Sequence, residues 1–88
     1  MTIQEIEYTA HFKRAYQRLD ISVQRKAEQK EVLFRKNTFA PMLKTHKLHG
    51  KLKDFYSFSI DKNTRIVFQF TGRAKAVFLD VGSHNVYQ

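Results

Sequence analysis

The fold is decided by residues 55–81, which read FYSFSIDKNTRIVFQFTGRAKAVFLDV. Three runs of alternating residues, 55–60, 65–70 and 76–81, are separated by short turns at 61–63 and 71–73. Alternation with a period of two is typical of strands that place one face on a core. Polar turns of this length join neighbouring antiparallel strands. The stretch therefore predicts a three-stranded antiparallel meander.

The same alternation assigns the side chains of the meander to two faces. One face is apolar and is expected to carry Tyr56, Phe58, Ile60, Ile66, Phe68, Phe70, Val77, Leu79 and Val81. The opposite face is expected to carry Ser57, Ser59, Arg65, Gln69 and Asp80. Because helices would cover the apolar face, the polar face is the natural place for a functional site.

The N-terminal half predicts a strand followed by a helical hairpin. Residues 2–8 alternate and favour a short strand. Apolar residues at helical spacing predict a helix over 9–19, which Thr9 can cap, and helix-forming residues predict a second over 22–37, which Asp20 or Ser22 can cap. Pro41 excludes helix through the preceding residue, and residues 42–51 are interpreted as a loop. The chain is thus expected to form one α+β domain over 1–88, with a four-stranded sheet and helices on one face.

Charge indicates a polyanionic partner. The chain has 88 residues and a net charge of +8. Between Glu31 and Asp54 there is no acidic residue, while the segment contains Arg35, Lys36, Lys44, His46, Lys47, His49, Lys51 and Lys53. Such clustering points to nucleic acid, an anionic membrane surface or an acidic protein; a basic surface that only maintains solubility is the alternative.

Composition excludes several classes of protein. There is no cysteine, and therefore neither a disulfide framework nor a thiolate metal site. No apolar run approaches the ~20 residues that span a bilayer, and the N-terminus lacks the layout of a secretory signal. We expect a cytoplasmic protein without a membrane partner.

Two motifs in the C-terminal half resemble a known family. The stretch LHGKLKDFYSFSIDKNTRIVFQF (48–70) and the ending VFLDVGSHNVY (77–87) combine a leucine–x–glycine loop, a strand led by arginine, and a final glycine–x–histidine with a tyrosine. This pattern resembles the RelE/ParE superfamily of toxins from type II toxin–antitoxin systems. The ending and the loop THKLHG (45–50) are closer to the YafQ-like RNase branch than to the gyrase-directed ParE branch.

The resemblance implies a RelE-like fold and a metal-independent endoribonuclease that cuts mRNA in the ribosomal A site. Its implied partners are the ribosome, mRNA and an acidic, helical antitoxin. It implies no cofactor, metal or small-molecule ligand. Two alternatives stay open, a ParE-like inhibitor of DNA gyrase and a catalytically weak protein that binds ribosomal RNA.

Metal-free RNA cleavage needs a base for the 2′-hydroxyl, a cation for the phosphorane charge and an acid for the leaving 5′-oxygen. Arg65 matches the strand-leading arginine of the family, and its guanidinium suits a phosphate. The alternative is that Arg65 forms only a surface ion pair without a role in function. His84 matches the C-terminal histidine and would act as acid or base. His46 matches the upstream loop histidine, and His49 could share or replace its role. Tyr87 would stack on a base or orient a phosphate, or simply anchor the chain end.

The remaining expectations concern the basic loop. Lys44, Lys47, Lys51 and Lys53 are expected to bind RNA, and RelE itself uses lysines near 51 and 53 for phosphate contact and base work. A metal site built from His46, His49 and His84 is not expected, because the spacing is weak and nearby lysines repel a cation. The YafQ-like histidine and aspartate of the second and third strands are not matched clearly here. Asp61 is only a loose match, so the general base stays unassigned.

Overall fold

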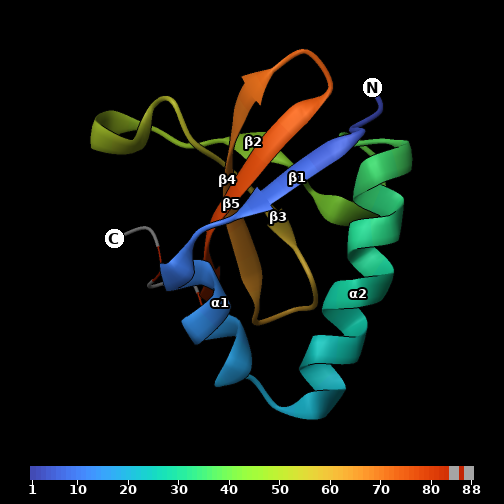
Figure 1. Ribbon diagram of the computed structural model, residues 1–88, viewed down its shortest axis with the longest axis vertical. Coiled ribbons are helices and arrows are strands. Elements are labelled where there is room, and N and C mark those ends of the chain that lie inside the picture. The colour runs from blue at the N-terminus through green and yellow to red at the C-terminus, as the bar shows by residue number, and fades with distance from the viewer. Residues whose placement is uncertain (84–85, 87–88) are drawn as a thin grey trace.

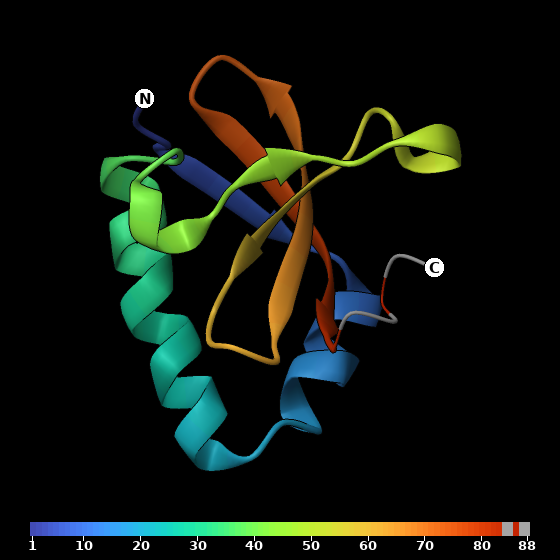
Figure 2. The same cartoon turned by 180° about the vertical axis from the view of Figure 1, so that it is seen from behind.

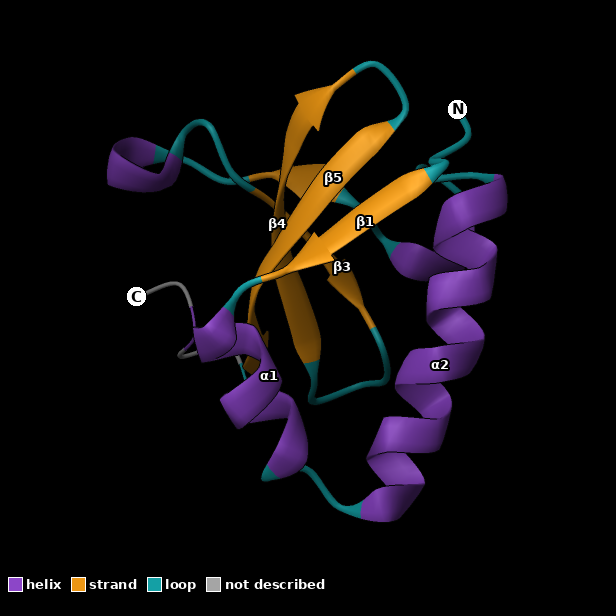
Figure 3. Ribbon diagram, in the orientation of Figure 1, coloured by secondary structure: helices purple, strands orange, loops and turns teal. Residues whose placement is uncertain are grey.

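The computed structural model describes residues 1–83 and residue 86. Two helices and two short 3-10 helices accompany five strands (Figures 1 and 3): β1 (Glu5–Tyr8), α1 (Ala10–Gln17), α2 (Ile21–Lys36), η1 (Pro41–Leu43), β2 (His46–Lys47), η2 (Gly50–Leu52), β3 (Tyr56–Ser59), β4 (Arg65–Gly72) and β5 (Lys75–Gly82). The predicted α+β class is confirmed, and the helices and main strands lie where they are expected, with ends shifted by a few residues.

Local signals explain where the helices begin. The Thr9 side chain accepts a hydrogen bond from the Phe12 backbone N–H at 3.0 Å, which confirms the predicted cap of α1. Asp20 occupies the corresponding position before α2 but makes no capping hydrogen bond through its side chain. The two helices meet at this short connection and diverge along the sheet (Figure 1).

The sheet has the order β1-β5-β4-β3-β2. The meander β3-β4-β5 is antiparallel as predicted, while β1 joins it in parallel to β5, with Ile6 opposite Ala76. The expected count of four strands is wrong, because His46 and Lys47 form a fifth strand against Ser57 and Tyr56. Two residues are too few to show an alternation, and the strand arises because Lys44 turns the chain back along β3 with a left-handed φ of 51°.

The apolar face of the last strand differs from its prediction. Val81 lies opposite Ile66, and Phe78 lies opposite Phe68, so Leu79 is an extra residue without a partner in the ladder. Such a β-bulge reverses the phase of the alternation. Ala76 and Phe78 are therefore buried on the core face in place of the expected Val77 and Leu79.

The turn before β5 also differs from its predicted position. β4 continues through Gly72, and the connection consists of Arg73 and Ala74 rather than residues 71–73. Ala74 adopts a left-handed φ of 59°, which the sequence does not indicate because alanine is uncommon in that conformation.

Both helices pack on the same face of the sheet, as predicted. Phe34 of α2 is fully buried and stacks on Phe58 with ring centroids 4.7 Å apart, while its edge meets Phe68 at 4.9 Å. Phe12 of α1 contacts Phe78 of β5 at 5.5 Å. This aromatic core fixes the sheet from one side and leaves its other face for function. Within the described residues, no helix is long and apolar enough to cross a membrane.

Candidate functional site

The register of the sheet gathers polar residues on the face that the helices do not cover. His46, Ser57, Val67 and Asp80 form one cross-strand row, and Ser59, Arg65 and Gly82 form the next. The predicted grouping of Ser57, Ser59, Arg65 and Asp80 on one face is thus confirmed. The centre of this face is buried, since Ser57 and Val67 are 0% and 4% exposed. Its solvent-accessible groups therefore lie around these two residues.

Arg65 is the best-placed cation of this face. It begins β4 and lies directly opposite Ser59 of β3, and its Nη1 donates a hydrogen bond to Ser59 Oγ. Ser59 is itself buried, so it forms a fixed anchor for a half-buried guanidinium. A planar fork held in this way is suited to a phosphate, because less side-chain freedom is lost when the ligand binds.

Gly82 of β5 lies directly opposite Arg65 in the sheet. A Cβ atom at Gly82 would lie 2.6 Å from Val86 Cγ1, so glycine lets the C-terminal turn close against the strand. The Val86 N–H donates to the Ser83 carbonyl at 3.0 Å within this turn. The predicted catalytic residues His84 and Tyr87 lie outside the described residues.

A basic pocket of about 300 Å³ extends from Arg65 past the edge of β3. Four cations from four segments line it: Lys30 of α2, Lys44 after η1, Lys62 of the β3–β4 turn, and Arg65; Met42, Ser59, Ile60 and Asp61 complete it. The Asp61 carboxylate is engaged in its own turn, where its Oδ1 accepts the N–H groups of Asn63 and Thr64 at 2.9 and 2.8 Å. The pocket therefore presents an excess of positive charge.

Asp61 is held in its ionised form. Partial burial acts to raise its pKa, but the hydrogen bonds from Asn63 and Thr64 and the nearby charge of Lys26 lower the pKa below its usual value. Lys26 Nζ lies 3.6 Å from Asp61 Oδ2. The carboxylate charge is thus balanced by a lysine that does not line the pocket.

The two histidines of the loop lie in different elements, because His46 belongs to β2 and His49 follows it. His46 lies on the same face as Arg65, and its Nδ1 is 2.9 Å from the Lys44 carbonyl oxygen. Strand spacing and rise put the Cα atoms of His46 and Arg65 roughly 12 Å apart. His49 instead precedes η2, as an exposed residue.

The predicted RNA-binding lysines do not act as one group. Lys44 lines the basic pocket with Arg65, whereas Lys47 pairs with Tyr56 and so faces the other side of the sheet. Lys51 and Lys53 are exposed at η2, which stands clear of the sheet at the end opposite the β3–β4 turn (Figure 2). The structure therefore separates the η2 cations from Arg65.

One polar pair was missed by sequence reasoning. His11 Nε2 of α1 lies 3.1 Å from Asp80 Oδ1 on the site face, beside a hollow of about 320 Å³ that Arg14 and Arg18 also line. Lys30 and Lys62 were missed as well. The sequence signal for His11 is its place in the first turn of a capped helix. Its partner Asp80, however, depends on the parallel pairing of β1 with β5, which no local pattern predicts.

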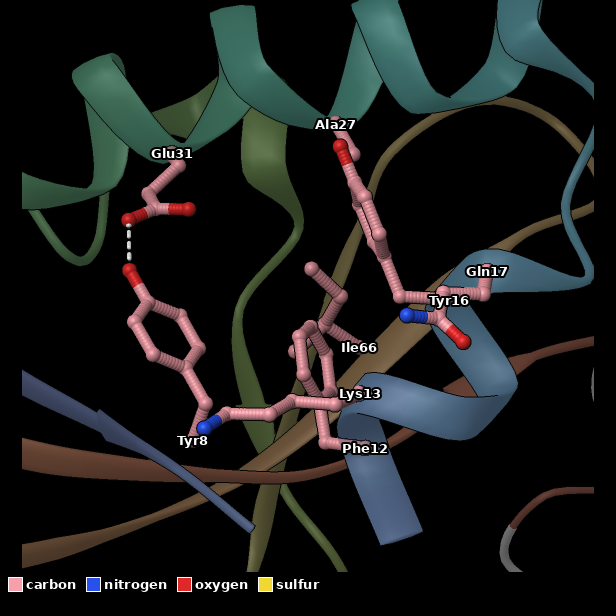
Figure 4. Close-up of a pocket in the computed structure, with 8 residues that line it drawn as sticks. All are labelled: Tyr8, Phe12, Lys13, Tyr16, Gln17, Ala27, Glu31 and Ile66. Carbon is pink, nitrogen blue, oxygen red and sulfur yellow. Dashed lines mark hydrogen bonds between the residues drawn. The ribbon is translucent and has the colours of Figure 1, made fainter. Parts of the chain in front are cut away.

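A second, mainly apolar pocket of about 310 Å³ lies between the helices (Figure 4). Its lining comprises Tyr8, Phe12, Lys13, Tyr16, Gln17, Ala27, Glu31 and Ile66. The Tyr8 hydroxyl donates a hydrogen bond to Glu31 Oε2 at its border. Burial first, and then the hydrogen bond and charge of Glu31, raise the pKa of Tyr8 to about 12, although Arg35 opposes the shift. The lining is mainly apolar, and the Glu31 carboxylate already accepts the Tyr8 hydroxyl, so this pocket lacks the clustered cations of the basic pocket.

Metal ligands do not gather in the described part of the chain. No three histidine, aspartate or glutamate side chains lie close enough there to hold an ion. The groups available for chemistry are therefore the Arg65 guanidinium, the pocket lysines and single imidazoles.

Comparisons with known proteins identify the fold. No protein-family model matches the sequence, and no curated protein matches it. Among solved structures, a YoeB/ParE toxin from Agrobacterium tumefaciens superposes with a TM-score of 0.78 at 20% identity, covering 92% of this chain and 99% of that one. YafQ from E. coli strain BL21(DE3) gives 0.72 at 18% identity, with 93% and 94% covered.

A toxin–antitoxin complex, RelBE2 from Mycobacterium tuberculosis, also matches, with a TM-score of 0.69 at 16% identity over 96% of this chain and 94% of that one. At these identities the likeness concerns the fold, and it agrees with the motifs of residues 48–70 and 77–87. The chain has the fold of the RelE/ParE-superfamily toxins.

Proposed function

We propose that this protein is the toxin of a type II toxin–antitoxin system and that it cleaves mRNA in the ribosomal A site without a metal. The observation that carries the proposal is the Arg65 guanidinium, anchored by Ser59 on the face that the helices leave uncovered. The net charge of +8 and the toxin fold support it.

In the proposed reaction the 2′-hydroxyl oxygen attacks the adjacent phosphorus, and the bond from phosphorus to the 5′-oxygen breaks. A base takes the 2′-hydroxyl proton, and an acid gives a proton to the leaving 5′-oxygen. Arg65 stabilises the negative charge on the phosphorane oxygens. The products are a 2′,3′-cyclic phosphate and a free 5′-hydroxyl.

The role of His84 as general acid or base stays a prediction, as does the stacking of Tyr87 on a nucleobase. Only the family motif assigns these two roles. His46 is the described histidine that shares the face of Arg65 and also belongs to that motif. Lys47 faces the other side of the sheet, and His49, Lys51 and Lys53 flank or belong to η2, which lies at the end of the sheet opposite the β3–β4 turn. These four residues therefore suit contacts with ribosomal RNA better than contacts with the reacting atoms.

The proposed regulator is an acidic, helical antitoxin. Two structural relatives support this, since a DinJ–YafQ complex from E. coli and RelBE2 are toxin–antitoxin complexes. A strongly basic toxin and an acidic partner attract one another over long range. The proposed place of action is the cytoplasm, where mRNA is translated.

The test is a cell-free translation reaction with mapping of mRNA ends by primer extension. The proposal expects cuts in frame with the A site that require ribosomes and disappear with Arg65→Ala. Lys36→Ala is the matched control, because it removes one positive charge from the exposed end of α2. Normal translation with intact mRNA would contradict the proposal, and a gyrase supercoiling assay would then test the ParE-like alternative.

A further inference from the structure

The basic pocket beside Arg65 has the properties of an anion site. Lys30, Lys44 and Lys62 converge on it from three separate segments, and Arg65 forms its border with the proposed catalytic face. Among the described residues, none of these three lysines has a carboxylate within 4.0 Å of its amino group. No described carboxylate therefore pairs directly with these lysines, and a bound anion would reduce their mutual repulsion.

The acidic residue of the lining does not fill this role. Asp61 Oδ1 is occupied by two backbone N–H groups, and Oδ2 faces Lys26. Its carboxylate therefore stabilises the β3–β4 turn and does not pair with the pocket lysines. An incoming anion meets cations on several sides and only one carboxylate, which is already satisfied.

The backbone at Lys44 supports a role for this side chain. Lys44 ends η1 in the left-handed conformation, with φ 51° and ψ 38°, where glycine or asparagine is more usual. A residue with a side chain is strained in this region. Its N–H donates to the Pro41 carbonyl at 3.2 Å, and its carbonyl meets His46 Nδ1, so the strained residue is fixed at the pocket.

We propose that this pocket binds a backbone phosphate of the RNA next to the phosphate that Arg65 contacts. The inference rests on the proposed function and extends it, because it gives the path of the strand from Arg65 past the edge of β3 to Lys30 of α2. The volume of about 300 Å³ is at the lower end of small-ligand sites, which suits a phosphate group and part of a sugar.

The experiment measures binding separately from cleavage. The probe is a short fluorescent RNA with methylated 2′-hydroxyls, which cannot be cut, and its anisotropy is followed at several salt concentrations. Each phosphate contact on a single strand contributes about 0.7 to the slope of log K against log salt. Lys30→Ala and Lys62→Ala are each expected to weaken binding several-fold and to lower that slope by about 0.7.

Lys36→Ala is the matched control on the same helix, and it should leave the slope unchanged. Equal effects of Lys30→Ala, Lys62→Ala and Lys36→Ala would reduce the pocket to general surface charge and overturn the inference. An unchanged RNA affinity together with weaker binding of the antitoxin would also overturn it, because the pocket would then serve protein carboxylates. If the RNA slopes behave as expected while wild-type protein cuts no mRNA, the proposed function fails and the phosphate site stands.

Discussion

His11 and Asp80 join the first turn of α1 to the face that carries Arg65, with Nε2 and Oδ1 3.1 Å apart. The imidazole is 61% exposed, and exposed ion pairs stabilise proteins by less than about 1 kcal/mol. We therefore expect a double-mutant cycle of His11→Ala and Asp80→Ala in urea unfolding to give a coupling energy below about 1 kcal/mol. A larger coupling would show that the pair fixes the helix on the sheet.

Arg65→Ala should abolish most cleavage while leaving the fold intact. Loss of a group that stabilises transition-state charge typically lowers kcat by about 10²–10³-fold. Arg65→Lys should restore little, because an ammonium cannot reproduce the planar fork. Ser59→Ala should have a smaller effect, since it removes only the anchor. The measurement is the rate of mRNA cutting on programmed ribosomes, with circular dichroism as the check on folding; wild-type rates for Arg65→Lys would contradict the role of the fork.

Gly82→Ala should disturb the C-terminal turn, because its Cβ would lie 2.6 Å from Val86 Cγ1. Gly82 or Val86 must shift to relieve this contact, and the predicted site residues His84 and Tyr87 lie between and next to these two positions in the sequence. We expect strongly reduced cleavage with little change in the urea midpoint. Gly82→Ala combined with Val86→Ala removes the clash and should recover part of the activity. Full activity in the single variant would show that the position of this segment does not matter.

Alkaline stability should depend on Tyr8. Its pKa is about 12 in the folded protein and 10.0 in an unperturbed tyrosine. Between these values the unfolded chain releases a proton that the folded chain keeps, so the free energy of unfolding falls as the pH rises. Below about pH 10 the contribution is fully present. Urea midpoints for wild type should therefore decrease over this range more steeply than for Tyr8→Phe; parallel pH profiles would be evidence against a raised pKa of Tyr8 in the folded protein.

The β3–β4 turn should depend on Asp61. Because the pKa of this carboxyl is lowered in the folded state, its contribution is present above the usual value of 3.8 and is lost as the pH falls through the folded value. Asp61→Ala removes two hydrogen bonds to backbone N–H groups and should cost about 1–2 kcal/mol at neutral pH. Asp61→Asn keeps an acceptor oxygen, so it should cost less. An unfolding midpoint of Asp61→Ala equal to that of wild type would show that the carboxylate does not organise the turn.

Much of the fold follows from residues 55–81, because alternation and polar turns are local signals. The helix cap at Thr9 and the grouping of Ser59 and Arg65 on one face follow in the same way. The bulge at Leu79 could not be predicted, because residues 79–81 (LDV) are compatible with either face of the strand turning toward the core. Only packing in the folded protein selects one of the two arrangements. The short strand of His46 and Lys47 likewise depends on a neighbour that is distant in the chain.

The candidate site is predictable only in part. A strand-leading arginine and a clustered charge single out Arg65 and Lys44. Lys30 and Lys62 resemble any other solvent-facing lysine in sequence, and only the approach of α2 to the β3–β4 turn gives them a shared pocket. Conversely, Lys51 and Lys53 have the charge expected of the site but lie in and directly after η2, away from the basic pocket.

The parallel pairing of β1 with β5 affects how the protein is made. Ile6 lies opposite Ala76, about 70 positions away, so the first strand has no partner until nearly the whole chain has left the ribosome. A nascent chain can form the helical hairpin early, but the closed sheet, and with it the row of Ser59, Arg65 and Gly82, must wait for the last strand. Such distant contacts also slow folding. Under the proposed function, an antitoxin made at the same time would have an interval in which to bind before the toxin could act.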